Sequence, residues 1–407
     1  MFGTGLFCLS LLSFGAWIVL VMFHGGFWRA RQRLDGAPGE LDRWPAVTAL
    51  VPARNEADVI GECVTRLMRQ SYPGRFRVVV IDDHSTDGTA AAAATAAARA
   101  GSAERLAVVR ARALEPGWAG KVWALSEGHA HAGRAFPDTR YFWLTDADIA
   151  HDPSNLRRLV AKAEEDRRDL VSQMVVLTSE GFWAGFLIPA FVFFFQKLYP
   201  FAWVNDPGRR TAAAAGGSVL LRREALERIG GLAALRDALI DDCALARAVK
   251  GNRREGGGRI WLGLTTAARS LRPYHGLAGV WRMVARSAFT QLRYSVFLLA
   301  GTLAGMALLY WGVPIMVLAA LAAGRTAALL CALGAWALMT LAFIPTLRLY
   351  GKSLLAAPSL PLAGLLYSLM TLASAVAYWR GRGGAWKGRT LSAETRGGTA
   401  SANRLKD

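Results

Sequence analysis

Residues 141–148 read Tyr-Phe-Trp-Leu-Thr-Asp-Ala-Asp, an apolar run that ends in two carboxylates one residue apart. The run predicts a buried strand, with Asp146 and Asp148 where the strand meets solvent. Because side chains alternate along a strand, we expect these two to point the same way and Ala147 the other. Carboxylate oxygens suit Mg²⁺ or Mn²⁺, which keep open positions for phosphate oxygens. The pattern favours a cation that holds a diphosphate; the alternative is a turn with solvated aspartates.

The chain on either side of this run alternates between strand and helix patterns. Strands are predicted at 46–51, 77–81, 106–110 and 141–145, and helices at 57–70, 90–100 and 121–131. Repeated β-α units imply an α/β fold with a mostly parallel sheet and helices on both faces. Ligands of such sheets collect at the C-terminal ends of the strands.

Polar residues follow the first two predicted strands. The first is followed by Pro52, Ala53, Arg54, Asn55 and Glu56, and the second by Asp82, Asp83 and the sequence His-Ser-Thr-Asp-Gly-Thr up to residue 89. Asp82 and Asp83 can accept hydrogen bonds from a ribose or a base, and a glycine lets backbone approach a ligand. Ordinary helix capping is the alternative for each loop.

Three later elements add charge and close backbone approach. Lys121 starts a helix after a glycine-containing turn, where a phosphate could bind. Gly216, Gly217 and Ser218 form a small-residue segment, and Asp241 and Asp242 form an acidic pair. Taken alone, that pair favours stabilisation of a helix dipole.

Composition indicates membrane and water-exposed regions in one chain. Of 407 residues, 53% are hydrophobic, and mean hydropathy is +0.25. Residues 5–23 carry no charge and are followed by Arg29, Arg31 and Arg33, the reverse of a cleaved signal peptide. We interpret them as a retained anchor whose basic flank is cytoplasmic.

Three further candidate spans are 296–323, 326–347 and 358–379. A fifth apolar stretch, 181–203, is aromatic and contains two prolines, which favours an interfacial or re-entrant segment. If one span precedes the water-exposed region and three follow it, the C-terminus lies outside the cell. The arginines and lysine at 380–389 favour the cytoplasm. Either one of the last three stretches does not cross, or residues 181–203 add a crossing.

The net charge of +18 does not indicate nucleic acid, because the basic residues are spread over membrane flanks rather than interleaved with aromatic residues. Four cysteines without close spacing are expected to be reduced and structural.

The order of these motifs resembles the family 2 glycosyltransferases, inverting enzymes of the GT-A fold that use nucleotide-diphosphate sugars. The matching elements are VPARNE (51–56), DDHSTDGT (82–89), GWAGKVWAL (117–125), TDAD (145–148), GGS (216–218) and IDD (240–242). WKGR at 386–389 resembles the ending of membrane-bound members. The anchor, the aromatic segment and the last spans look most like the hopene-associated glycosyltransferases, and more distantly like ceramide glucosyltransferases.

The resemblance implies roles for individual residues. It implies that residues 52–56 and Asp83, with Asp82 beside it, hold the nucleoside, and that Asp146 and Asp148 hold Mg²⁺ or Mn²⁺ and the diphosphate. Lys121 would neighbour the phosphates, and Gly216, Gly217 and Ser218 the acceptor. Asp242 would be the catalytic base for a single displacement with inversion. The family's usual pair is Glu-Asp, so the role of Asp241 as a second catalytic acid stays open.

Processive synthases carry a Q-x-x-R-W motif near the membrane, whereas this chain has Gln291, Leu292, Arg293 and Tyr294. We therefore expect a single sugar, from a UDP-sugar donor, to reach a membrane lipid acceptor such as a hopanoid. Gln291, Arg293 and Tyr294 line the acceptor entrance or only anchor a helix. The alternatives are a polysaccharide synthase and an inactive membrane scaffold.

The expected organisation has four parts. Residues 1–28 are the anchor, 45–290 a cytoplasmic GT-A domain that includes the segment 181–203, 294–380 the C-terminal membrane helices, and 381–407 a basic tail. The expected location is the inner membrane.

Overall fold

The computed structural model describes residues 2–37, 39–238, 241–251, 256–381, 385–386 and 389–390. The chain divides into two compact units, each described by itself. Unit 1 comprises residues 1–31, 178–203 and 273–383, and unit 2 comprises 32–177, 204–272 and 384–407. The segment 181–203 and residues 273–290, expected within the catalytic domain, therefore belong to unit 1. Within that unit α6 (Phe182–Leu198) and α10 (Gly276–Ala285) pack against each other.

Unit 2 is built on an eight-stranded sheet of order β3-β2-β1-β4-β7-β6-β8-β5. The strands are β1 (Val47–Ala53), β2 (Phe76–Asp82), β3 (Leu106–Arg110), β4 (Tyr141–Thr145), β5 (Ile149–His151), β6 (Leu170–Val176), β7 (Ser218–Arg222) and β8 (Ile260–Ser270). The first four strands pair in parallel, β6 pairs with β8 in parallel, and β7 and β5 run antiparallel to their neighbours. The expected α/β fold with a mostly parallel sheet is confirmed.

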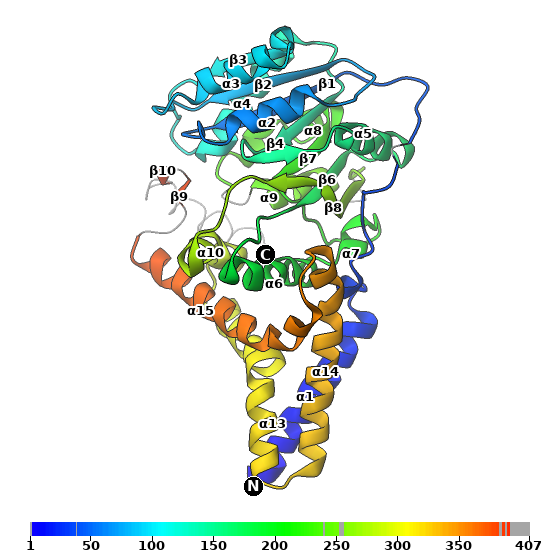
Figure 1. The fold of residues 1–407 in the computed structure, drawn as a ribbon, viewed down its shortest axis with the longest axis vertical. Helices are drawn as coiled ribbons and strands as arrows, with labels where there is room; N and C mark the ends of the chain where they lie inside the picture. Colours follow the sequence, from blue (N-terminus) through cyan, green and yellow to red (C-terminus); the bar gives the residue numbers. More distant parts are fainter. Residues whose placement is uncertain are drawn as a thin grey trace. The chain divides into compact units, whose positions relative to one another are not determined.

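Helices cover both faces of this sheet (Figure 1). The helices of unit 2 are α2 (Ile60–Met68), α3 (Thr89–Arg99), α4 (Gly120–Ala135), α5 (Asn155–Glu165), α8 (Arg223–Arg228) and α9 (Asp241–Lys250). Apolar side chains of α2, α3 and α5 pack on one face in the main core, and α4 contacts β1 and β2 from the other. Every residue of β1 is buried, which fits a central strand covered on both faces. Each buried aliphatic side chain contributes about 1.5–3 kcal/mol relative to exposure.

Unit 1 is helical. Its helices are α1 (Phe2–Phe23), the 3₁₀ turn η1 (Phe27–Arg29), α6, α10, α11 (Ala288–Gln291), α12 (Val296–Met306), a π-helical turn η5 (Ala307–Trp311), α13 (Gly312–Ala322), α14 (Thr326–Leu349), η6 (Leu354–Ser359) and α15 (Leu360–Trp379); the short helix α7 (Phe201–Asn205) begins in this unit and ends in unit 2. Four helical stretches among the described residues are long and apolar enough to cross a membrane: 3–23, 296–322, 326–349 and 354–379. They coincide with the four predicted spans. The 17-residue α6 is shorter and contains Pro189.

Three residues of the sequence motifs lie outside the described residues: Ile240 of the IDD motif, and Lys387 and Gly388 of WKGR. The residues on either side of the last two form the two-residue strands β9 (Ala385–Trp386) and β10 (Arg389–Thr390).

Candidate active site

The sheet of unit 2 gathers the polar segments at one edge. Because β1, β2 and β4 are parallel, their carboxyl ends lie side by side, and each is followed by a loop that the sequence analysis singled out. The antiparallel β7 adds the glycine segment, since its first residue Ser218 pairs with Thr145, the last residue of β4. Gly216 and Gly217 therefore come beside Asp146.

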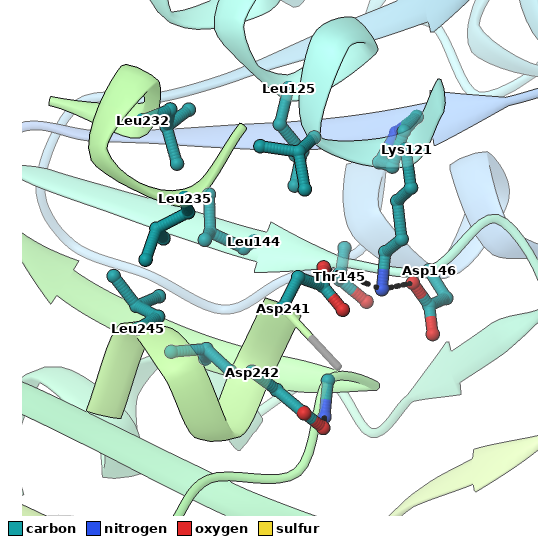
Figure 2. A pocket seen from close by; sticks show the side chains of 14 residues that line it. Lys121, Leu125, Leu144, Thr145, Asp146, Leu232, Leu235, Asp241, Asp242 and Leu245 are labelled. Atoms are coloured by element: carbon teal, nitrogen blue, oxygen red, sulfur yellow. Dashed lines mark hydrogen bonds and ion pairs between the residues drawn. The ribbon is translucent and has the colours of Figure 1, made fainter. Parts of the chain in front are cut away.

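Lys121 is the central cation of this edge (Figure 2). Its Nζ lies 2.8 Å from Oδ1 of Asp146 and 3.4 Å from Oδ2 of Asp241. Burial alone would lower the pKa of Lys121, but the charges of Asp146 and Asp241 outweigh it and hold that pKa above its ordinary value. The lysine therefore stays charged and links the acid after β4 to the acid at the start of α9.

Asp242 is fixed by two backbone donors. The N–H of Gly216 donates to Oδ2 at 2.8 Å and the N–H of Cys243 donates to Oδ1 at 2.7 Å. Burial, followed by the charge of Asp241, raises the pKa of Asp242 to about 6, while Lys121 and the backbone donors oppose that rise. A carboxylate with a pKa near neutrality and a fixed orientation suits general-base chemistry.

These residues line one pocket of about 410 Å³ of empty space, which includes its open mouth. One side is polar, and the other is formed by aliphatic side chains (Figure 2). The lining residues are Pro52, Lys121, Val122, Leu125, Leu144, Thr145, Asp146, Gly216, Val219, Leu232, Leu235, Asp241, Asp242 and Leu245. Convergent ionisable groups beside an apolar wall are the usual features of a ligand site.

Asp148 faces a different cation. Asp146 and Asp148 lie in the turn between β4 and β5 and not in a strand, so strand alternation is not what orients them; both are partly exposed, whereas Ala147 between them is buried. Nε of Arg272 lies 3.3 Å from Oδ2 of Asp148, and the same guanidinium donates to Glu56. Arg272 follows β8, which is antiparallel to β5, and this pairing brings it beside the turn.

Sequence reasoning missed Arg272. Arg272 comes two residues after the end of β8, a strand that was not predicted, so no pattern marked it. The leucines that line the apolar side of the pocket were missed as well. Those on α9 and η3 (Leu232–Leu235) come next to the pocket only when the chain folds, and no local pattern marks them.

The described residues contain no group of three or more His, Cys, Asp and Glu side chains that could hold a metal. Asp146 and Asp148 remain the two ligands that the sequence suggested. Burial raises the pKa of Asp146, the charge of Lys121 opposes that rise, and the charge of Asp148 adds to it. Mg²⁺ commonly takes one or two carboxylates and completes its shell with water and phosphate oxygens. Two adjacent carboxylates at an open sheet edge fit that requirement.

Hydrogen bonds and an ion pair join the loop after β1 to the loop after β2. Nη1 of Arg54 donates to the carbonyl oxygen of Asp83 at 2.5 Å and lies 3.6 Å from its carboxylate. The Asn55 carboxamide oxygen accepts from the N–H of Thr86 at 2.9 Å. Asp82 accepts from the N–H of Ser85 at 3.1 Å, and Asp83 is fully buried. Pro52 also lines the pocket, whereas Ala53 is buried at the end of β1.

A buried polar network lies behind the Asp146 turn. His151 is 1% exposed, and burial lowers its pKa to about 3, so it is neutral. Nδ2 of Asn155 donates to Nδ1 of His151 at 3.1 Å, which leaves Nε2 to donate to the hydroxyl of Thr145 at 2.8 Å. That hydroxyl in turn donates to the carbonyl oxygen of Gly217 at 2.9 Å. The network joins the end of β4 to the glycine segment.

The remaining predicted site residues are not in the pocket. The Ser218 side chain is fully buried, and its hydroxyl accepts from Nε1 of Trp143 at 3.0 Å. Gln291, Arg293 and Tyr294 belong to unit 1. There Gln291 accepts from the Tyr199 hydroxyl at 2.8 Å, and Tyr294 stacks on Tyr378 with ring centroids 4.3 Å apart. Arg293 is exposed.

Comparisons with solved structures support the fold. The chain is similar to the mannosyltransferase PcManGT from Pyrobaculum calidifontis, solved with GDP-Man and Mn²⁺, with 22% identity over 93% of this chain and 99% of that one and a TM-score of 0.53. Two further matches have TM-scores below 0.5 and are less similar. Glucosyl-3-phosphoglycerate synthase from Mycobacterium tuberculosis, solved with phosphoglyceric acid, is 17% identical over 64% of this chain and 86% of that one, with a TM-score of 0.41. TarS from S. aureus, solved with UDP-GlcNAc, is 16% identical over 60% and 66%, with a TM-score of 0.38.

No curated protein matches the chain significantly. Residues 48–230, which span β1 to the end of α8, match the family described as Glycosyl transferase family 2. These residues contain the paired loops, Lys121, the Asp146 turn and the glycine segment, and, apart from β8, the strands of the expected GT-A-like sheet. The chain therefore carries a glycosyltransferase family 2 domain and is a glycosyltransferase.

Proposed function

We propose that this enzyme transfers one sugar, with inversion, from a nucleotide-diphosphate sugar to a membrane lipid. The observation that carries the proposal is the convergence of Lys121, Asp146, Asp241 and Asp242 in one pocket of a glycosyltransferase family 2 domain. The donor class is also supported by PcManGT, whose structure contains GDP-Man and Mn²⁺.

The donor is assigned to the edge formed by β1, β2 and β4. Arg54, Asn55 and Asp83 lie together in the paired loops and would hold the nucleoside, with Pro52, Ala53, Glu56 and Asp82 shaping the loops. UDP is the nucleotide that we expect. Lys121, at the start of α4, would meet the diphosphate with its ammonium group and with the N-terminal end of the helix.

Asp146 and Asp148 would hold Mg²⁺ or Mn²⁺. When bound, the cation would offset the negative charge that develops on the departing diphosphate. Arg272 now lies between Asp148 and Glu56, so it would contribute positive charge beside the same carboxylates.

Asp242 would act as the base. Its carboxylate would take the proton of the acceptor hydroxyl while that oxygen forms the new bond to the anomeric carbon and the bond to the diphosphate breaks. One base without a nucleophilic carboxylate fits a single displacement, by analogy with inverting glycosidases. Asp241 would hold Lys121 rather than take part in proton transfer, since its carboxylate faces the ammonium group.

A lipid acceptor is supported by four helices that could cross a membrane and by the aliphatic wall beside Asp242. A hopanoid, an apolar molecule with a hydroxylated end, has the chemistry that such a pocket would accept. Gly216, with the adjacent Gly217 and Ser218, would place backbone against the sugars, and Gln291, Arg293 and Tyr294 would line the route from the membrane. We place the enzyme in the inner membrane with unit 2 in the cytoplasm, because basic residues flank its spans.

The test is a donor panel on membranes that contain the protein. Radiolabelled nucleotide sugars are added with Mn²⁺ or Mg²⁺, and the lipids are extracted and analysed for labelled product. We expect one sugar on a lipid, loss of product with a chelator, and recovery when Mn²⁺ is restored. Long polymeric products would instead identify a processive synthase.

The matched variants are Asp242→Asn and Asp237→Asn. Asp242→Asn should abolish transfer and keep donor binding measured by calorimetry. Asp237 is exposed and not in the pocket, so Asp237→Asn should retain transfer. Turnover by Asp242→Asn would overturn the assignment of the base. A protein that binds neither nucleotide sugar nor Mn²⁺ would be an inactive scaffold.

A further inference from the structure

Contacts within unit 1 define two ends and a middle for its helices. At one end, Gly3 of α1 packs closely against Arg325, which precedes α14. A Cβ atom added to Gly3 would lie only 2.8 Å from the guanidinium group. In the middle, Nε1 of Trp17 donates to the carbonyl oxygen of Leu309 at 2.8 Å. At the other end, His24, just after α1, lies 2.8 Å from the carbonyl oxygen of Lys197 near the end of α6. We call these the Arg325 end and the His24 end.

Helix α15 begins in the middle of this arrangement. Nε1 of Trp336, halfway along α14, donates to the carbonyl oxygen of Pro358 in η6 at 2.9 Å. Gly364, in the first turns of α15, packs closely against Tyr310, which is halfway along the stretch 296–322. A Cβ atom added to Gly364 would lie 2.8 Å from Cβ of Tyr310. Both contacts place the start of α15 at mid-depth.

The other terminus of α15 returns to the His24 end. The N–H of Phe289 in α11 donates to Oγ of Ser374 at 3.1 Å. Tyr378 stacks on Tyr294, which precedes α12, and the rings of Phe289 and Trp379 lie 5.6 Å apart. The stretch 296–322 runs from the His24 end to Arg325. The last turn of α15 packs beside the start of that stretch, so it lies at the His24 end. Figure 1 shows α1, α13 and α14 running together to the N-terminal end of the unit and α15 lying away from it.

Burial agrees with this path. Half of the apolar window in Leu354–Trp379 is buried within the structure, against 22–33% in the other three stretches. A segment that enters the bilayer without crossing must be covered by protein, because its irregular backbone has no water to bond there. The 3₁₀ turn η6, which leads α14 into α15, is such a backbone.

Charge in unit 1 is one-sided. Residues 1–31, 178–203 and 273–383 contain eleven Lys and Arg and a single acid, Glu180. Among the described residues of unit 1, Arg325 is the one basic side chain at its own end. Arg282 and Arg286 on or just after α10 and Arg380 after α15 are exposed, and α10 packs against α15. Unit 1 offers these arginines almost no carboxylates, so their counterions must come from elsewhere.

We propose that Leu354–Trp379 enters the bilayer and leaves on the same face, and that Arg282, Arg286 and Arg380 then form one surface that binds the headgroups of anionic phospholipids. Anionic headgroups attract such cations at the membrane surface, and Trp379 and Tyr378 beside Arg380 suit the membrane–water boundary. The chain then crosses the bilayer three times instead of four. The basic residues after α15 lie on the same side as those after α1, as the positive-inside rule predicts. The inference rests on the membrane location proposed above but not on the transfer reaction.

The first test reads the side of the membrane directly. Single cysteines at Arg380, Ala278 and Ala323 are introduced in a Cys8→Ala, Cys331→Ala background, which leaves the buried Cys63 and Cys243 in place. Vesicles of each orientation are treated with a membrane-impermeant maleimide. We expect Arg380→Cys to be labelled in the same vesicles as Ala278→Cys on α10, and Ala323→Cys, next to Arg325, in the opposite ones. Labelling of Arg380→Cys together with Ala323→Cys would overturn the re-entrant path.

The second test measures the lipid. The purified protein is melted in detergent with added phosphatidylglycerol or phosphatidylcholine, and the difference in melting temperature is recorded. Arg282→Gln/Arg286→Gln/Arg380→Gln should lose more than half of that difference, while Arg325→Gln and the triple Arg→Lys variant should keep it. An unchanged difference in the triple Gln variant, or an equal loss in Arg325→Gln, contradicts the headgroup surface. Either result is independent of whether sugar transfer is found.

Discussion

The ammonium group of Lys121 lies 2.8 Å from the carboxylate of Asp146 and 3.4 Å from that of Asp241. Asp146 directly follows β4 and Asp241 starts α9, and these positions are far apart in the sequence. With Asp242 beside them, three buried or partly buried carboxylates share one cation. Their negative charges would repel one another without it, so Lys121 contributes to both the stability of the site and its protonation state.

Replacement of Lys121 by Gln should therefore change more than the rate. We expect transfer to fall at least 100-fold, the melting temperature to drop by several degrees, and any residual activity to require a higher pH, because the remaining acids ionise less readily. The control is Lys162→Gln, which removes a partly exposed i,i+4 pair with Asp166 worth about 0–1 kcal/mol. Activity and melting temperature that match those of this control would show that Lys121 is not the central cation.

The pH dependence of transfer should report Asp242. Its pKa is raised to about 6, so the carboxylate that can accept a proton is present above this value and is lost as the pH falls through it. With metal and donor saturating, we expect the rate to fall about tenfold per pH unit below 6. An acidic limb that begins below pH 5 would show that the limiting group is an ordinary carboxylate.

Gly216 is a position where one methyl group should disturb the site and leave the fold intact. An added Cβ would lie 3.3 Å from Oδ2 of Asp242 and 3.3 Å from Nζ of Lys121. Both groups would shift by a few tenths of an ångström, and we expect Gly216→Ala to lower kcat about tenfold.

The matched change is Gly133→Ala in α4, where the added methyl meets open space. It should leave kcat unchanged and stabilise the helix by about 0.5–1 kcal/mol. Equal kcat values for Gly216→Ala and Gly133→Ala would contradict the tight packing inferred at Asp242.

Sequence patterns predicted much of this fold because they are local. β3 and β4 begin and end at the predicted residues, since their apolar and β-branched side chains and the turn residues around them act over a few positions. The four apolar stretches could also be predicted, because length and lack of charge define them.

The arrangement of the site was less accessible. Arg272 reaches Asp148 across 124 residues, through the antiparallel pairing of β8 with the three-residue β5, and neither strand has a distinctive pattern. The path of Leu354–Trp379 was also undetermined, because composition measures whether a helix tolerates lipid and not where its ends lie.

His151 is buried behind the Asp146 turn, where no substrate needs to touch it. Replacing it by Leu removes the donor to Thr145 and the acceptor for Asn155, and the unsatisfied buried groups should cost roughly 2–4 kcal/mol. We expect a lower melting temperature and reduced kcat, since Thr145 precedes Asp146 and bonds to Gly217. His131→Leu, at a partly exposed position on α4, should change stability by no more than about 0.5 kcal/mol.

The pH dependence distinguishes this role from simple packing. The pKa of His151 is lowered to about 3, so the unfolded chain binds a proton that the folded protein does not. Its contribution to stability is therefore complete above an unfolded pKa of about 6.5 and is lost as the pH falls toward 3. The stability difference between the wild type and His151→Leu should narrow by about 1.4 kcal/mol per pH unit below 6.5, which melting curves between pH 7 and pH 5 can measure. A constant difference across that range would mean that His151 contributes by its shape alone.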